Sequence, residues 1–138
     1  MKIGELANLA DTAVETIRYY EREGLLPPAP RSEGNYRIYD TAHAQRLAFI
    51  RHCRSLDMAL DEIRVLLRFK DNPGEDCGDV NALLDAHIGH VAERVRALRE
   101  LERQLRTLRS RCQDIRQAED CGILSGLSAP AGHEGTLR

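Results

Sequence analysis

Residues 79–112 constrain this chain more than any other segment, because they predict one long helix with a single narrow apolar stripe. The segment contains no proline and only one glycine, Gly89. Its large apolar side chains recur at steps of three and four residues, which is the pattern of a coiled coil. These side chains are Leu84, Ile88, Val91, Val95, Leu98, Leu101, Leu105 and Leu108. A helix of this length spans about 50 Å, and the rest of the 138 residues is too short to cover its stripe. We therefore expect two copies of the chain to associate through this helix.

The first part of the chain predicts two short helices joined by a tight polar turn, which is a helix-turn-helix arrangement. Apolar residues have helical spacing over residues 3–8, and a second helix is expected to run to about Arg22 and to end at Gly24. Asp11 or Thr12 would cap the second helix at its N-terminus. The chain must then leave helical geometry, because prolines follow directly.

A short hairpin is expected over residues 32–39, where the pair Gly34-Asn35 is a turn signal and the following aromatic and β-branched residues favour a strand. Such a hairpin would form a wing beside the helix-turn-helix. Amphipathic helices are expected over residues 41–56 and 58–69. The predicted fold is therefore mainly α. In chain order it comprises a winged helix-turn-helix domain over 1–70, a linker over 71–78, the dimerisation helix over 79–112, a loop with a short helix over 113–127, and a disordered tail over 128–138.

Bulk composition excludes several classes of protein. The formal net charge is −2, and no apolar run is long enough to cross a membrane. Charged side chains near the N-terminus interrupt any signal-peptide core, so the cytoplasm is the expected compartment. Four cysteines in a reducing compartment favour metal binding or redox chemistry over structural disulfides. There is no phosphate loop, nucleophile elbow or acid/base pair, so we expect no enzyme.

Two runs carry a family resemblance: TAVETIRYYEREGLL at residues 12–26 and NYRIY at residues 35–39. Together they resemble the MerR family of regulators over the first 70 residues, and the long helix and distal cysteines extend the likeness to about residue 127. The resemblance implies a two-fold dimer joined by an antiparallel coiled coil. It also implies a transcriptional activator and repressor that shares its promoter with RNA polymerase, sits on an overlong promoter spacer, and distorts the DNA when its effector binds.

A helix-turn-helix dimer presents two recognition helices to a pseudo-palindromic site. The side chains expected to contact promoter DNA are Thr16, Arg18, Tyr19 and Tyr20 on the second helix, and Tyr36 and Arg37 on the wing. They would reach base edges and phosphates, and bending of the spacer would add indirect readout. Other roles stay open, since Tyr19 or Tyr36 could belong to the core and Arg18 could pair with Glu15 or Glu21.

The metal site is predicted from the positions of three cysteines. Cys77 lies just before the long helix and Cys112 at its far end, about 50 Å away along one helix. They cannot share an ion within one chain. In an antiparallel dimer, however, Cys77 of one subunit faces Cys112 and Cys121 of its partner, so that three thiolates converge twice per dimer.

Three thiolates favour soft or borderline ions. Relatives that sense monovalent ions of the copper group have serine at the position of Cys77, so the resemblance implies a divalent ion. The residues around 76–78 and 80–88 look most like the cadmium- and lead-responsive branch. Cd(II) or Pb(II) is therefore the expected effector, with Zn(II) or Hg(II) as alternatives, since ligand softness alone does not separate them.

Other residues have weaker roles in this interpretation. Cys53 lies on an apolar helix face and is expected to be a core thiol. His87 and His90 are three residues apart on the long helix and could form an accessory site, although surface histidines are the better interpretation. His43 and His52 belong to no motif. A rival from a different class is a zinc-stabilised structural dimer without promoter activity. A redox sensor of this family would need closely clustered cysteines, and a drug-binding member would need a further C-terminal domain.

Overall fold

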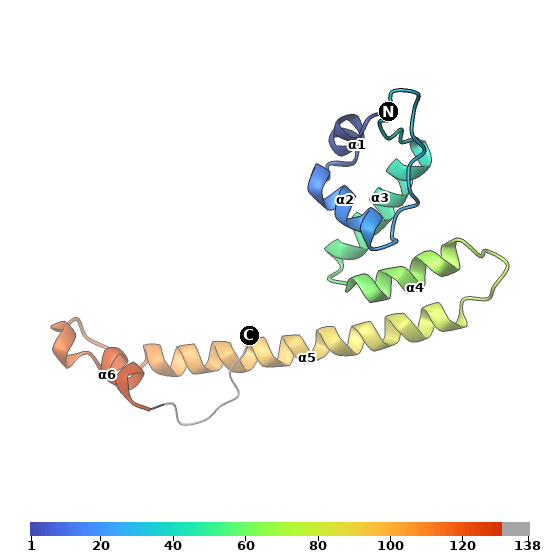
Figure 1. Cartoon of the computed structure of the whole chain (residues 1–138). Coiled ribbons are helices and arrows are strands. Elements are labelled where there is room, and N and C mark those ends of the chain that lie inside the picture. Colours follow the sequence, from blue (N-terminus) through green and yellow to red (C-terminus); the bar gives the residue numbers. More distant parts are fainter. Residues whose placement is uncertain (131–138) are drawn as a thin grey trace. The chain divides into compact units, whose positions relative to one another are not determined.

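The computed structural model describes residues 1–130 and is mainly helical there, with no strand (Figure 1). The α-helices in chain order are α1 (Ile3–Ala10), α2 (Val14–Arg22), α3 (Thr41–Ser55), α4 (Leu60–Lys70), α5 (Gly78–Arg109) and α6 (Gly122–Ser128). A single 3₁₀ turn, Ala118–Asp120, precedes α6. The chain divides into two compact units, one of residues 1–83 and one that begins at residue 84. The predicted tail over 128–138 lies outside the described residues from position 131 onward.

The first unit is built around one apolar core. Leu6 of α1 and Ile17 of α2 are completely buried, so the two short helices are held together by side-chain packing. Each fully buried aliphatic side chain stabilises the fold by about 1.5–3 kcal/mol. The other members of this core are Leu25, Leu26, Tyr39, Leu47, Ile50, Cys53, Met58, Ile63 and Leu67. Residues from α1 to α4 therefore form a single domain that fixes the position of α2.

The turn between α1 and α2 differs from the expected cap. Ala13 occupies the N-cap position of α2, and no side chain caps that end. Asp11 instead ends α1 in the left-handed region with φ 49°, and the Thr12 hydroxyl donates to the Ala10 carbonyl at 2.9 Å. The predicted cap by Asp11 or Thr12 is therefore wrong, because both residues are used to finish α1 in a tight turn.

The C-terminus of α2 confirms the expected stop at Gly24. Gly24 has φ 77°, a conformation that residues with a Cβ rarely adopt. The Leu25 amide donates to the Tyr20 carbonyl at 2.8 Å and the Gly24 amide donates to Glu21 at 3.2 Å. This is the Schellman pattern, and it turns the chain sharply from α2 toward the wing.

The wing is a turn with one isolated antiparallel bridge between Arg31 and Arg37, so the predicted strand over 32–39 is wrong. The turn itself is present, since the Asn35 amide donates to Ser32 at 2.9 Å and the Ser32 amide donates to Tyr36 at 2.8 Å. Prolines at positions 27, 28 and 30 precede this turn. Because proline has no amide hydrogen to donate, the bridge cannot extend into a ladder.

Helix α5 begins one residue before the predicted start and ends three residues before the predicted end, so Cys112 lies just beyond it. Its apolar stripe is exposed: Leu98 and Leu105 are each 58% accessible and Ile88 is 63% accessible. The remaining exposed members of the stripe are Leu84, Val91, Val95 and Leu101. None of the described helices is both long and apolar enough to cross a membrane.

Candidate functional site

A basic groove of about 670 Å³ opens between α2 and the wing in the first unit. Its charged lining is Lys2, Arg18, Arg22, Arg31 and Arg37, with Glu21 as the one acid among the groove residues. The Glu21 side chain is only 8% exposed, so the accessible charge of the groove is positive. Lys2 also lies 4.6 Å from the centre of the Tyr36 ring, which joins the start of α1 to the wing. This surface is suited to a polyanion.

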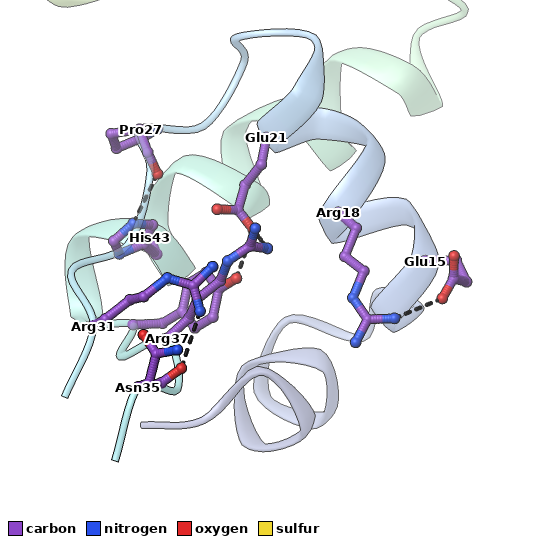
Figure 2. A network of polar contacts seen from close by, with 9 residues as sticks. Glu15, Arg18, Glu21, Pro27, Arg31, Asn35, Arg37 and His43 are labelled. Carbon is purple, nitrogen blue, oxygen red and sulfur yellow. Dashed lines mark hydrogen bonds and ion pairs between the residues drawn. The ribbon is translucent and has the colours of Figure 1, made fainter. Parts of the chain in front are cut away.

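Glu21 joins α2 to the wing through two hydrogen bonds (Figure 2). It accepts one from the Tyr39 hydroxyl at 2.5 Å and one from the Arg37 guanidinium at 3.3 Å. Burial raises the pKa of the Tyr39 hydroxyl, and the hydrogen bond to Glu21 raises it further. The Arg37 side chain remains 40% exposed. Glu21 therefore holds Arg37 in place while leaving part of the guanidinium accessible.

The six predicted DNA-contacting residues lie in two groups. Arg18, Tyr36 and Arg37 line the basic groove. Thr16, Tyr19 and Tyr20 line a second, smaller hollow, which they share with Glu15, Arg54 of α3 and Leu60 of α4. Since 3.6 residues make one helical turn, residues 16 and 20 lie on the opposite side of α2 from residue 18. A helix that enters the major groove can contact DNA on both of these sides.

One of the alternative roles considered for these residues, an ion pair between Arg18 and Glu15, occurs in the structure. Arg18 pairs with Glu15 at 2.9 Å, and both side chains are exposed (Figure 2). An exposed pair of this kind is worth at most about 1 kcal/mol, so it does not prevent Arg18 from contacting a phosphate. The core role considered for Tyr19 or Tyr36 is wrong, since both side chains are exposed, and it is Tyr20 that packs against the core.

His43 belongs to no sequence motif but holds the linker between α2 and α3. It is 5% exposed, and its Nε2 donates to the Pro27 carbonyl at 3.1 Å (Figure 2). Its Nδ1 lies 3.0 Å from the Asp40 carboxylate. Hydrogen bonds from the His43 amide and ring lower the pKa of Asp40. The only signal in the sequence is that Asp40 and His43 are three residues apart at a helix start, where capping occurs.

The four cysteines have different environments. Cys53 is buried at 7% exposure, and burial raises the pKa of its thiol, in agreement with the expected core role. Cys77 is exposed in the first unit. In the second unit, Cys112 and Cys121 lie close to each other across the loop that follows α5, because Gly122 packs directly on the backbone of Arg111. Two of the three predicted thiol ligands therefore converge within one chain.

The Cys121 sulfur is prepared for ionisation by the start of α6, where Cys121 is the N-cap residue. The nearby backbone amides of Leu124 and Ile123, and the Arg116 cation, lower its pKa. The pKa of Cys112 is raised, mainly by the neighbouring Cys121 sulfur, and the Cys112 thiol donates to the Asp114 carbonyl at 3.2 Å. Cys121 is therefore the more readily ionised of the two thiols.

Two glycines on one face of α6 allow this helix to pack closely against the end of α5. A Cβ at Gly122 would overlap the carbonyl oxygen of Arg111, and a Cβ at Gly126 would meet the Arg111 guanidinium and the Leu108 side chain. Gly122 directly follows Cys121, so this close approach also fixes the position of the Cys121 sulfur. The spacing of four residues that places both glycines on one face is visible in the sequence.

We expect Gly122→Ala to lower the affinity for Cd(II) by about 10-fold, since displacing a ligand's support commonly costs 10- to 100-fold. The added methyl group would meet backbone, which cannot rotate away. Titration of the reduced protein, followed by thiolate-to-metal charge transfer, measures the effect. Gly89→Ala is the matched control, because a Cβ at Gly89 meets no atom within 4 Å. Equal affinities for the two variants would contradict this role of Gly122.

His90 is exposed on α5, whereas His87 is only 8% exposed, so the expectation of a surface histidine is wrong for His87. An accessory metal site formed by the two histidines stays a prediction.

Comparison with known proteins identifies the family. Residues 1–70 match the model of the MerR HTH family regulatory protein, and residues 44–108 match the MerR DNA-binding model. The crystal structure of the transcription regulator PbrR691 from Ralstonia metallidurans CH34 in complex with lead(II) superposes with a TM-score of 0.82. It is 55% identical over 93% of this chain and 99% of that one.

Two curated relatives from Haemophilus influenzae are also similar. The HTH-type transcriptional regulator ZntR homolog is 46% identical over 80% of this chain and 82% of its own length. A probable heavy metal-dependent transcriptional regulator is 37% identical over 93% of this chain and 99% of its own length. With the basic groove beside α2 and the long helix in place, these matches show that the chain belongs to the MerR family of helix-turn-helix transcriptional regulators.

Proposed function

We propose that this protein is a homodimeric, metal-responsive transcriptional regulator that controls a heavy-metal resistance promoter. The effector is Cd(II) or Pb(II), held by Cys112 and Cys121 of one subunit and Cys77 of the other. The observation that carries the proposal is the close approach of Cys112 and Cys121, where Gly122 at the start of α6 packs directly on the backbone of Arg111. Two neighbouring thiols would supply part of the ligand set of a soft metal ion.

A second subunit supplies the missing ligand in this proposal. The exposed stripe on α5 needs an apolar partner, and an antiparallel copy of the same helix provides one. In that arrangement the start of one α5, next to Cys77, lies beside the end of the other, next to Cys112. Dimerisation and metal binding are then coupled, because neither subunit holds three thiolates alone.

The choice of ion rests on ligand chemistry and on one relative. Zn(II) prefers four ligands in a tetrahedron, whereas three thiolates satisfy softer ions. The 55% identical PbrR691 was crystallised with lead(II). These points favour Cd(II) or Pb(II) over Zn(II) and Hg(II), which remain the alternatives.

The basic groove and the second hollow provide the DNA-binding part of the proposal. Arg18 and Arg37 would contact phosphates of a pseudo-palindromic promoter, and the tyrosines of α2 and the wing would add hydrogen bonds to the DNA backbone. Metal binding would shift the two DNA-binding domains of the dimer between two DNA-bound arrangements, with RNA polymerase reading the distorted promoter. The metal ion can favour one arrangement only if it binds that arrangement more tightly than the other.

Titration of the reduced, metal-free protein with Cd(II) tests the metal site. Thiolate-to-metal charge transfer should saturate at two ions per dimer and be lost in Cys77→Ser, and competition with Pb(II), Zn(II) and Hg(II) would rank the ions. Absence of the charge-transfer band would contradict metal sensing. A dimer that binds Zn(II) but leaves no footprint on the DNA upstream of its own gene would instead be a structural dimer.

Arg18→Ala tests the DNA-binding surface. Each lost phosphate contact reduces the magnitude of the slope of log affinity against log salt concentration by about one. Because the dimer contains two copies of Arg18, the variant's slope should be smaller in magnitude by about two. The measurement is a salt series of binding to a duplex selected by the wild-type protein. Arg99→Ala, an exposed arginine on α5, is the matched control. If both variants keep the wild-type slope, Arg18 does not contact phosphate.

A further inference from the structure

The C-terminus of α2 is held by two arginines from other helices of the first unit. Arg64 of α4 donates to the Glu23 carbonyl at 3.1 Å and to the Glu23 carboxylate at 2.7 Å. Arg46 of α3 donates through Nε to the Leu25 carbonyl at 2.7 Å. Cations at this end of a helix are favourable, because the helix dipole places partial negative charge there. Together these bonds fix the turn through which α2 leaves toward the wing.

Arg46 also reaches the end of α4, where it meets Asp71. Its two terminal nitrogens donate to the two Asp71 oxygens at 2.8 and 3.1 Å. This is the bidentate geometry that makes Arg–carboxylate pairs directional. The Arg46 side chain is only 19% exposed, and its hydrogen bonds lower the pKa of Asp71. A single guanidinium thus joins the carbonyl that follows α2 to the carboxylate that ends α4.

Asp71 is the first residue after α4, and the segment that follows leads directly to Cys77. We propose that Arg46 and Asp71 form a latch that transmits the state of the Cys77 segment to the C-terminus of α2. Arg46 and Asp71 are positioning residues in this role, since neither is among the proposed metal ligands or DNA-contacting residues. The inference rests on the proposed function, because it requires a metal ion held in part by Cys77.

The latch passes a restraint on Cys77 through Asp71 and Arg46 to the end of α2. When Cys77 is held by a metal ion, the segment from Asp71 to Cys77 loses freedom, and Asp71 keeps its carboxylate on Arg46 for a larger share of the time. Arg46 in turn keeps the Leu25 carbonyl fixed, and Leu25 closes the Schellman turn of α2. The ion therefore stabilises the end of the recognition helix without contacting it.

Hydrogen exchange of the full-length, reduced protein with and without Cd(II) tests the latch independently of any promoter. In the wild type, Cd(II) should slow exchange of the Gly24 and Leu25 amides at least about twofold, the lower end of typical coupling effects. Asp71→Asn should abolish that slowing. Asp71→Glu should retain it, because it keeps the carboxylate. Charge transfer in the same samples reports whether Cd(II) is bound.

Asp11→Asn is the matched control variant. Asp11 pairs with Arg51 at 2.7 Å in the same unit, and asparagine tolerates the left-handed conformation at this position. It should respond to Cd(II) like the wild type. If Cd(II) is bound and Asp71→Asn still shows wild-type slowing, or if Asp11→Asn loses the slowing equally, the latch is overturned while metal sensing stands. Absence of Cd(II) binding in the wild type would overturn both.

Discussion

Cys112→Ser is expected to lower the affinity for Cd(II) by more than about 100-fold, because loss of a direct ligand should exceed the 10- to 100-fold cost of losing a supporting contact. Serine keeps the size of the side chain but replaces a soft thiolate donor with a hard hydroxyl. The variant also leaves Cys121 without its neighbouring thiol. Isothermal titration of reduced wild type and variant with Cd(II) measures the difference.

Cys53→Ala is the control for this prediction. Cys53 is buried in the core of the first unit and has no part in the proposed site. Its removal should lower the free energy of unfolding without changing the affinity for Cd(II). A Cys112→Ser protein that bound Cd(II) as tightly as the wild type would remove Cys112 from the site.

Leu98→Asp is expected to dissociate the dimer. Leu98 lies in the middle of the apolar stripe of α5 and is 58% exposed in the single chain. In a two-fold dimer the substitution places two carboxylates in the apolar seam, and burying an unpaired charge costs several kcal/mol per ion. Sedimentation velocity at micromolar concentration should show a monomer.

Arg96→Asp provides the comparison for Leu98→Asp. Arg96 is exposed and lies two residues before Leu98, away from the stripe. It introduces the same carboxylate without entering the apolar seam, so the dimer should persist. If Leu98→Asp remained dimeric, another surface would have to hold the subunits together.

The parts of the fold that follow from local pattern could be predicted from the sequence. The absence of proline and the repeated apolar steps defined α5 to within three residues of its end. Gly24 marked the end of α2, because only glycine readily adopts a positive φ there. The wing and the cap of α2 could not be predicted in the same way. Tyr36 and Ile38 favour a strand by themselves, but the prolines on the opposite side of the turn cannot donate the hydrogen bonds that a longer strand pair needs. The Thr12 hydroxyl, expected to cap α2, instead donates to the Ala10 carbonyl.

The polar contacts that organise the site depend on tertiary structure, and the sequence does not reveal them. Glu21 accepts a hydrogen bond from Tyr39, which lies 18 residues later in the sequence, and Arg46 donates to Asp71, which lies 25 residues later. Neither pair has a spacing that periodicity would detect. Likewise, the spacing of Cys112 and Cys121 does not itself bring them together. Their contact depends on the loop and on the close packing of α6 at Gly122.

Reconstitution of a mixed dimer tests the cross-subunit metal site most directly. One subunit carries Cys77→Ser and the other carries Cys112→Ser, and the heterodimer is purified with two different affinity tags. A cross-subunit site predicts one Cd(II) per heterodimer with wild-type affinity, because Cys112 and Cys121 of the first subunit meet Cys77 of the second. Both parent homodimers should lack the site. If the heterodimer binds Cd(II) no better than the parent homodimers, the three cysteines do not form a site shared between subunits.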